Sequence, residues 1–207
     1  MIYEHPDKTQ PIRQGDIFYP LPLMDLDLNS LVALYEGKFE ESSWQMIKDR
    51  ENIVINVPIK PTWGIVATQD CDASRSPIIS LFEIGTFKDV TGLQLLSSPK
   101  KWVNLITQRS RLNARWFYLP SNNSIGFKER MAINFHVVFQ IPRDNLEEYV
   151  DELRRGRLNE TAYQHYRERI AQYFRRYPYD EWYPLTKEEF IEYDKEKGPV
   201  KPFKWQK

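Results

Sequence analysis

The sequence has almost no cysteine, and this scarcity limits the class of protein. Its 207 residues include one cysteine, Cys71, so no disulfide can form within the chain. A single thiol is typical of a protein in a reducing cytosol. The first residues are charged and include no apolar run, and no stretch of about 18 apolar residues occurs elsewhere. We therefore expect a cytoplasmic protein with no secretory signal and no membrane-spanning helix.

An excess of charge of either sign is also absent. Lysine and arginine together number 29, as do aspartate and glutamate, so the formal net charge is zero. A neutral chain produces no overall field that would attract nucleic acid or an anionic membrane. Binding of such a ligand would therefore depend on a local basic patch.

Aromatic residues and short apolar segments are what the sequence does have. Hydrophobic residues make up 41% of the chain, enough for a core, and the length predicts one domain or one domain with an appendage. Period-two patterns and turn residues dominate residues 12–142, whereas helical spacing follows. We expect a mainly β fold with α additions: a flexible N-terminus at 1–11, a β-barrel at 12–142 with an insertion at 21–60, and a C-terminal helical extension at 143–207 that packs on the barrel.

Four helices are predicted in some detail, over 40–50, 99–109, 143–155 and 160–177, and a capping box at Thr186 begins a last short one. In the fourth helix, apolar and aromatic side chains fall at helical spacing and form one stripe. The stripe consists of Tyr163, Tyr166, Ile170, Tyr173, Phe174 and Tyr177.

Two carboxylates flank Cys71 where an apolar strand ends. On an extended strand Asp70 and Asp72 would point to one face and could bind Mg²⁺ or Mn²⁺, but the sequence signals no third ligand. We favour the alternative that both accept backbone N–H groups in the turn. The carboxylates disfavour a Cys71 thiolate, which predicts a buried packing residue. His136, on an apolar strand, is likewise expected in the core.

The order of these motifs resembles the MazF/PemK-type toxins. Gly15-Asp16-Ile17 matches the strand that opens their barrel, and Ile65 to Asp70 followed by Ser76-Pro77 matches their two central strands. The resemblance covers only part of the chain. It implies an SH3-like barrel and a metal-independent endoribonuclease.

The resemblance also implies candidate catalytic residues. The toxins use an arginine before the central strand and a Ser or Thr at its end; here Thr68 stands at the hydroxyl position and Lys60 near the arginine position. Lysine lacks the planar fork that clamps a phosphate, so Arg13 or Arg75 would have to supply it. Asp70 and Asp72 add negative charge where a phosphate would lie, which opposes RNA binding.

A second, less distinct resemblance is to a group of uncharacterised bacterial proteins with a QGD start and an SQxCD-type core. The matching segments here are Gln14-Gly15-Asp16, residues 68–72, Phe117 to Pro120 and Tyr173 to Arg176. Such proteins accompany mobile-element or phage-defence genes, and the resemblance implies the same setting for this chain.

The C-terminal segment is the local exception to the neutral charge, because arginines alternate there with tyrosines. Basic residues among aromatics can bind single-stranded RNA. Alternatively, the tyrosines pack on the barrel while the arginines face solvent or a protein partner. The candidate contacts for a partner or RNA are Arg167, Arg169, Tyr173, Arg175 and Arg176.

These patterns together favour a non-catalytic, or catalytically eroded, partner protein of a bacterial phage-defence or toxin–antitoxin module. It would bind a protein partner from its operon, with RNA as a second ligand and no cofactor or metal; a homodimer stays open. The alternative is an active endoribonuclease. The expected binding groove consists of Gln14, Asp16, Gln69, Asp70, Cys71 and Asp72, with polar side chains joined in one network if their strands are adjacent.

Charge reversal in the helical tail tests the assigned contacts. Arg175→Glu combined with Arg176→Glu should weaken the complex with a partner protein, because the attraction at the interface is removed. The melting temperature should stay unchanged. Association measured by calorimetry that equals the wild-type value would contradict the assignment.

Overall fold

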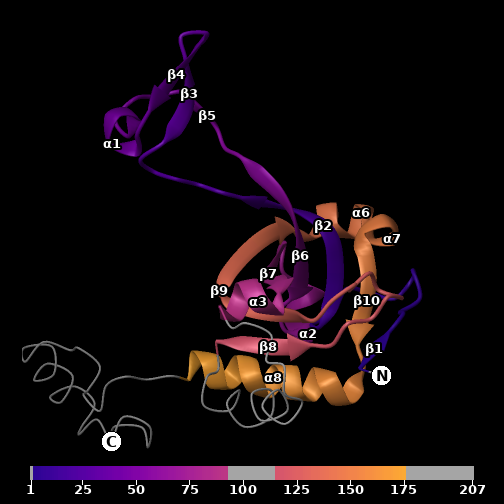
Figure 1. The fold of residues 1–207 in the computed structure, drawn as a ribbon. Coiled ribbons are helices and arrows are strands. Elements are labelled where there is room, and N and C mark those ends of the chain that lie inside the picture. The colour runs from indigo at the N-terminus through magenta and orange to yellow at the C-terminus, as the bar shows by residue number, and fades with distance from the viewer. Residues whose placement is uncertain (1, 93–114, 176–207) are drawn as a thin grey trace, which may run out of the picture. The chain divides into compact units, whose positions relative to one another are not determined.

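The fold is built on one antiparallel sheet of seven strands (Figure 1). The computed structural model describes residues 2–92 and 115–175. The strand order is β1 (Tyr3–Glu4), β10 (Arg154–Leu158), β2 (Asp16–Met24), β6 (Ile59–Val66), β7 (Ile78–Thr86), β9 (Met131–Pro142) and β8 (Trp116–Leu119). This arrangement confirms a mainly β fold with α additions.

The helices outside the insertion are short, apart from the last one described. They are α2 (Asp70–Ala73), α3 (Phe87–Thr91), α6 (Arg143–Glu148), α7 (Val150–Leu153) and α8 (Glu160–Phe174). Thr86 begins α3 as an N-cap, because its side chain accepts the Asp89 backbone N–H. The predicted helix at 160–177 is therefore present through Phe174, and the helices expected at 99–109 and after Thr186 lie outside the described residues.

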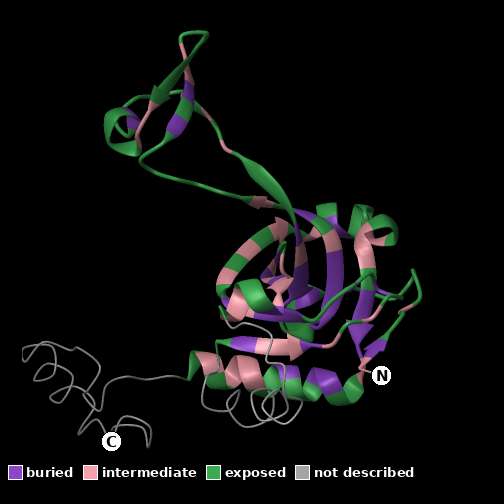
Figure 2. Ribbon diagram, in the orientation of Figure 1, coloured by how far each residue is buried: buried purple, intermediate pink, exposed green. Residues whose placement is uncertain are grey.

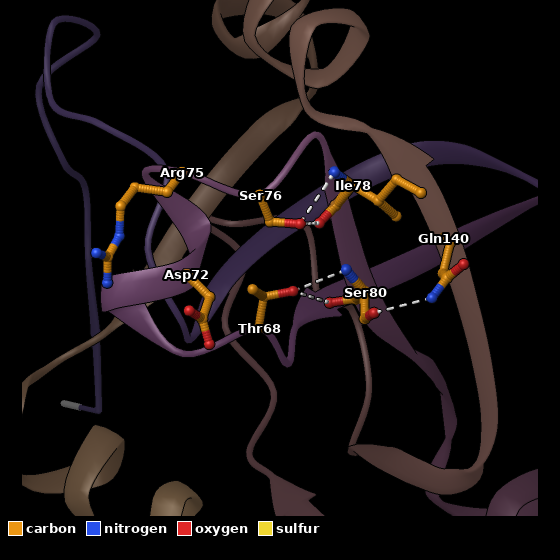
Figure 3. Close-up of a pocket in the computed structure, with 7 residues that line it drawn as sticks. All are labelled: Thr68, Asp72, Arg75, Ser76, Ile78, Ser80 and Gln140. Carbon is orange, nitrogen blue, oxygen red and sulfur yellow. Dashed lines mark hydrogen bonds between the residues drawn. The ribbon is translucent and has the colours of Figure 1, made fainter.

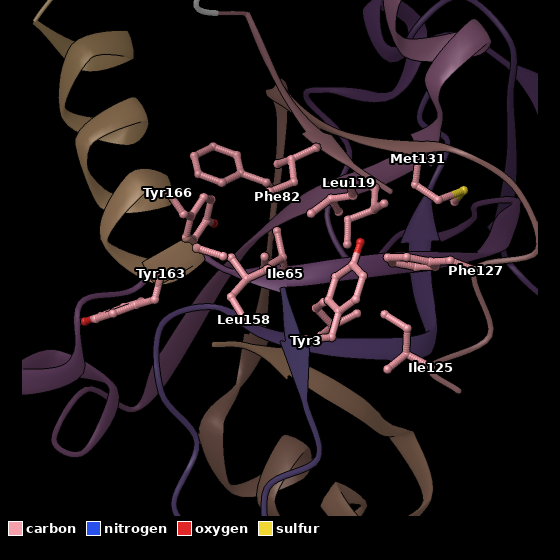
Figure 4. Packing of buried hydrophobic residues seen from close by; sticks show 14 of the residues in the cluster. Tyr3, Ile65, Phe82, Leu119, Ile125, Phe127, Met131, Leu158, Tyr163 and Tyr166 are labelled. Atoms are coloured by element: carbon pink, nitrogen blue, oxygen red, sulfur yellow. The ribbon is translucent and has the colours of Figure 1, made fainter. Parts of the chain in front are cut away.

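Apolar clusters cover both faces of the sheet, since successive residues of a strand point to opposite faces. On β6, Ile65 and Val66 are both fully buried but belong to different clusters. The Ile65 cluster includes Ala162, Tyr163 and Tyr166 of α8, and Figure 4 shows the two tyrosines beside Phe82 and Leu158. The Val66 cluster includes Phe18, Leu21, Ala73, Ile79, Leu81 and Leu146. Helices α2 and α6 thus pack on one face and α8 on the other.

The strands that carry the toxin-like motifs are neighbours. Ile17 of β2 pairs with Ile65 of β6, and the Gly15 backbone N–H donates to the Val66 carbonyl at 3.0 Å. Gly15 has a φ of +90°, in the left-handed region that side chains with a Cβ rarely adopt. On β6 a Cβ at Gly64 would come within 2.8 Å of Leu21 Cδ1, so only glycine lets these strands pack this closely.

The segment after residue 142 is not all helical, which corrects the prediction. The helix expected over 143–155 ends at Leu153, and Arg154–Leu158 forms β10 between β1 and β2. A strand is favoured here because Arg157 is buried against Asp16, which a surface helix could not provide. The expected flexible N-terminus is wrong for Tyr3 and Glu4, since both pair with β10 and Tyr3 is buried.

The insertion forms a separate small sheet with the order β4 (Lys38–Ser42), β3 (Leu31–Tyr35) and β5 (Val54–Asn56). Leu31, Ala33 and Ile47 form its core beneath α1 (Trp44–Ile47). The helix predicted over 40–50 is therefore reduced to one turn, because its first residues belong to β4 and pair with β3. Most of the insertion surface is exposed (Figure 2).

A buried ion pair joins β10 to β2. Arg157 Nη2 donates to Asp16 Oδ2 at 3.0 Å, Arg157 Nε donates to Asp16 Oδ1, and Arg154 Nη1 lies 3.4 Å from Asp16 Oδ2. Asp16 is fully buried and Arg157 is 4% exposed. Removing one partner would leave a buried charge unpaired, which is costly in a low-dielectric interior.

Asp16→Ala is expected to lower the free energy of unfolding by about 3–5 kcal/mol, because two arginines lose their buried counter-ion. Urea denaturation followed by circular dichroism measures this loss. Lys8→Ala is the control: it removes an exposed pair with Asp151 and should leave the midpoint nearly unchanged. Equal midpoints for the two variants would show that the Asp16 pair does not hold β10.

Candidate functional site

A groove with a volume of about 620 Å³ lies where β6 ends and β7 begins (Figure 3). Seven residues line it: Thr68, Asp72, Arg75, Ser76, Ile78, Ser80 and Gln140. They come from the segment after β6, from α2 and the loop that follows it, and from β7 and β9. One acid and one base are present, so the lining carries no net charge.

The hydroxyl groups in the groove are engaged with the backbone of β7. Thr68 Oγ1 accepts the Ser80 backbone N–H at 2.8 Å and donates to the Ser80 carbonyl at 3.5 Å. Ser76 Oγ accepts the Ile78 N–H at 3.2 Å and donates to its carbonyl at 2.8 Å. Gln140 Nε2 lies 3.4 Å from Ser80 Oγ. The Thr68 hydroxyl therefore bridges the end of β6 to β7.

Asp70 and Asp72 point in different directions, because both belong to α2 rather than to an extended strand. Residues two apart on a helix are rotated by about 200°. Asp70 accepts the Gln14 backbone N–H at 2.8 Å and the Tyr163 hydroxyl at 2.6 Å, whereas Asp72 lines the groove. The same-face prediction is wrong. Backbone capping is found for Asp70, although its donor comes from the N-terminal segment and not from the turn.

Metal-binding geometry is not found at this position. Between residues 2 and 92 and between 115 and 175, no three His, Cys, Asp or Glu side chains converge on a point that could hold an ion.

Tyr163 gathers charged groups at the start of α8. It is 5% exposed, and the guanidinium groups of Arg13 and Arg167 lie 5.2 and 5.3 Å from its ring centroid. Burial raises the pKa of Tyr163 to about 12, and its hydrogen bond to Asp70 adds to the effect. The phenol is therefore protonated and donates to Asp70 at neutral pH. One tyrosine thus holds a carboxylate and two arginines.

The four candidate catalytic residues are only partly brought together. Thr68 and Arg75 line the same groove, and Arg75 Nε also donates to the Cys71 carbonyl at 2.8 Å. Lys60 pairs with Glu83 at 3.2 Å and lies six residues before Val66 on β6, about 20 Å away. It cannot share a phosphate with Thr68.

Arg13 also departs from the predicted catalytic group. Its guanidinium lies over Tyr163, and Arg13 Nη2 is 3.4 Å from Glu4 Oε1. Neither Arg13 nor Lys60 lines the groove.

The predicted binding groove is also divided. Gln14 is buried, and its Nε2 donates to the Ala67 carbonyl at 2.6 Å, so it joins the Asp70 network as expected. Asp16 belongs instead to the buried arginine pair described above. Gln69 is exposed at the N-cap of α2. Cys71 is exposed, so its assignment as a buried packing residue is wrong.

His136 was also misassigned to the core. It is exposed on β9, where the Tyr173 hydroxyl lies 3.4 Å from its Nδ1. It lies between Phe135, which is buried, and Val137, which is half-buried, so the ordinary alternation of a strand turns His136 outward.

The tyrosines of α8 face the sheet, as one of the two alternatives predicted. Tyr166 is fully buried and donates to the Val66 carbonyl at 3.2 Å, while Tyr173 packs on Phe135 with ring centroids 5.4 Å apart. These rings are therefore not free to stack on bases. Among the arginines, Arg169 Nη1 lies 3.4 Å from Gln172 Oε1, and Arg175 is exposed. Arg176 lies outside the described residues.

Three groove residues had no sequence signal. Ser76 was noted only as part of the Ser-Pro motif, and Ser80 only as part of a strand. Gln140 comes from β9 and meets Ser80 across a sequence separation of 60 residues. Tyr163 was recognised as a packing residue, but nothing in its spacing pointed to Asp70.

Comparison with known proteins found no matching family model, no matching curated protein and no matching solved structure. Within the described part of the chain, none of the helices combines the length and the apolar character needed to cross a bilayer.

Tyr163→Phe tests the hydrogen bond that joins α8 to α2. It should lower the free energy of unfolding by about 1–3 kcal/mol at neutral pH, because Asp70 loses one donor. The pKa of Tyr163 is about 12 in the folded state and 10.0 as its ordinary value, so its contribution is complete below pH 10.0 and is lost as the pH rises towards 12.

The variant should accordingly lose stability less steeply than the wild type between these pH values. Denaturation at a series of alkaline pH values measures both slopes. Tyr149→Phe, at an exposed position, is the control for the neutral-pH loss. Parallel slopes for Tyr163→Phe and the wild type would contradict the Tyr163 assignment.

Proposed function

We propose that this chain is an SH3-like barrel protein of the MazF/PemK type that acts without catalysis, as a binding partner in a bacterial phage-defence or toxin–antitoxin module. Its groove beside Thr68 takes a segment of a protein partner. The single observation that carries this proposal is the neutral, hydrogen-bonding lining of the groove.

A polyanion such as RNA requires an excess of positive charge along its path. The groove offers one guanidinium, from Arg75, beside the carboxylate of Asp72. The other candidate cations are held elsewhere, Arg13 at Tyr163 and Lys60 at Glu83. A polypeptide, whose amides are neutral donors and acceptors, fits such a lining better than a phosphate backbone does.

The arrangement of the motifs supports the proposed fold. Asp16-Ile17 begins β2, residues 65–66 end β6, and the strand after Ser76-Pro77 is β7; these three strands are consecutive in the sheet. A toxin-like frame with an incomplete set of catalytic groups is what an eroded ribonuclease would retain. The setting in a defence module rests on the sequence resemblance.

RNA as a second ligand would bind away from the groove. The basic side chains described on and just after α8 include Arg167, Arg169 and Arg175. Because the tyrosines between them are turned towards the sheet, such binding would rest on phosphate contacts and depend strongly on salt.

An active endoribonuclease is the second candidate, and one observation favours it. Thr68, Asp72 and Arg75 share the groove, so a hydroxyl, a carboxylate and a guanidinium lie near one another. These are groups that could act on a ribose hydroxyl and stabilise charge on phosphorus.

Incubation of the purified protein with long RNA in EDTA separates the two functions. The proposal predicts intact RNA, because the Thr68 hydroxyl is bonded to β7 and, among the residues that the structure describes, Arg75 alone supplies a cation to the groove lining. Cleavage to cyclic-phosphate ends that disappears in Thr68→Ala would establish the ribonuclease instead.

A groove substitution tests partner binding directly. The chain is co-expressed with the product of the gene adjacent to its own, and the complex is measured by size exclusion and calorimetry. Gln140→Arg should weaken the complex by roughly tenfold or more, since it adds bulk and charge to the groove. Gln45→Arg, exposed on α1, is the matched control. Equal affinity of both variants would place the contact outside the groove.

A further inference from the structure

One face of the insertion sheet is apolar and exposed. Directly paired residues share a face, and Leu34 of β3 pairs with Phe39 of β4 and Val54 of β5. Phe39 is 68% exposed and Val54 is 60% exposed. Val32, two residues from Leu34 on the same face, is 37% exposed. We define these four residues as the free face.

The opposite face of this sheet is occupied. Leu31 and Ala33 alternate with Val32 and Leu34 and are buried against Ile47 of α1. The insertion sheet therefore has apolar side chains on both faces, buried on the α1 side and exposed on the free face. A row of apolar side chains across three strands costs solubility, and such patches mark interaction sites.

Charge is distributed unequally between the two faces. Lys38 pairs with Tyr35 on the α1 side, where Arg50 also lies over Tyr35 and forms an ion pair with Glu40. Glu41 pairs with Val32 and so belongs to the free-face side. Lys38 and Arg50 thus lie on the α1 side of the sheet, whereas Glu41 borders the free face.

The net charge of the whole insertion is also negative. Acidic residues outnumber basic ones between positions 21 and 60: Asp25, Asp27, Glu36, Glu40, Glu41, Asp49 and Glu51 against Lys38, Lys48, Arg50 and Lys60. Two copies of this chain meeting through the free face would bring acid against acid. Charge therefore favours a different molecule with basic residues over a second copy.

The width of the sheet selects the form of the ligand. Neighbouring strands lie about 4.8 Å apart, so three strands present a surface about 10 Å across, the diameter of one α-helix. We propose that the free face docks one amphipathic helix of the partner protein, with apolar residues against Phe39, Leu34 and Val54 and basic residues beside Glu41. This inference rests on the proposed function as a partner-binding protein, and it adds a second contact outside the groove.

A synthetic helix provides the probe. A peptide with leucines on one face and lysines on the other is titrated into the full chain. An analogue with glutamates in place of the lysines serves as its charge control. Calorimetry gives the affinity, and methyl NMR signals of Val32, Leu34 and Val54 report where the peptide lies. The lysine peptide should bind and shift these signals, and the glutamate peptide should bind far more weakly.

Substitutions on the free face should weaken this binding. Phe39→Ser and Val54→Ser should each reduce the affinity roughly tenfold, and Glu41→Lys should reverse the preference between the two peptides. Met46→Ser is the matched control, because Met46 is 64% exposed on α1. All four positions are exposed or on the sheet surface, so thermal unfolding should stay close to wild type and exclude misfolding as the cause.

Three results would overturn the inference. They are wild-type affinity in Phe39→Ser, equal binding of the two peptides, and a homodimer of the chain that Phe39→Ser abolishes, which would make a second copy the occupant. None of these measurements involves the groove. RNA cleavage that depends on Thr68 would therefore overturn the proposed function while leaving the peptide result intact.

Discussion

The hydrogen bond from the Tyr163 hydroxyl to Asp70, 2.6 Å long, is the interaction on which the site depends. It joins α8 to α2, and the second Asp70 oxygen accepts the Gln14 backbone N–H from the segment before β2. Arg13 and Arg167 lie over the same tyrosine ring, so this tyrosine contacts one carboxylate and two guanidinium groups, none of which lines the groove. Among the described residues that line the groove, one acid and one base balance each other, and this balance is the basis of the proposed binding of a polypeptide.

Because both faces of the sheet are covered, the groove lies at the margin of the sheet. Ile65 and Val66 are buried in opposite clusters, so the centre of β6 has no surface to offer. The groove lies just after the end of β6, where Thr68 and α2 follow the strand. The free face of the insertion is another accessible surface, since α1 packs on the opposite face of its three strands. Two separate contacts of this kind would give a partner higher affinity than either alone.

Local patterns predicted most of the strands, but not the contacts made by distant segments. Period-two patterns and turn residues correctly predicted a mainly β segment over much of 12–142. The adjacency of the strands at Gly15-Asp16-Ile17 and residues 65–70 was expected from the order of the toxin-like motifs, and β2 does pair with β6. The strand at Arg154–Leu158 was missed, since its arginines resemble a helix surface until Asp16 is placed beside Arg157. The metal alternative treated Asp70 and Asp72 as part of an extended strand, because the single turn of α2 gives no periodic signal. The groove itself needed Gln140, which only the register of β9 brings to Ser80.

The affinity of the groove for a phosphate backbone tests the central claim most directly. Fluorescence anisotropy of a labelled single-stranded RNA can be followed for the wild type and for Arg75→Ala over salt concentrations from about 50 to about 200 mM. If the groove lacks the positive charge that an RNA backbone requires, both proteins bind the RNA equally weakly at every salt concentration. Tight, salt-sensitive binding by the wild type that is lost in Arg75→Ala would contradict the account.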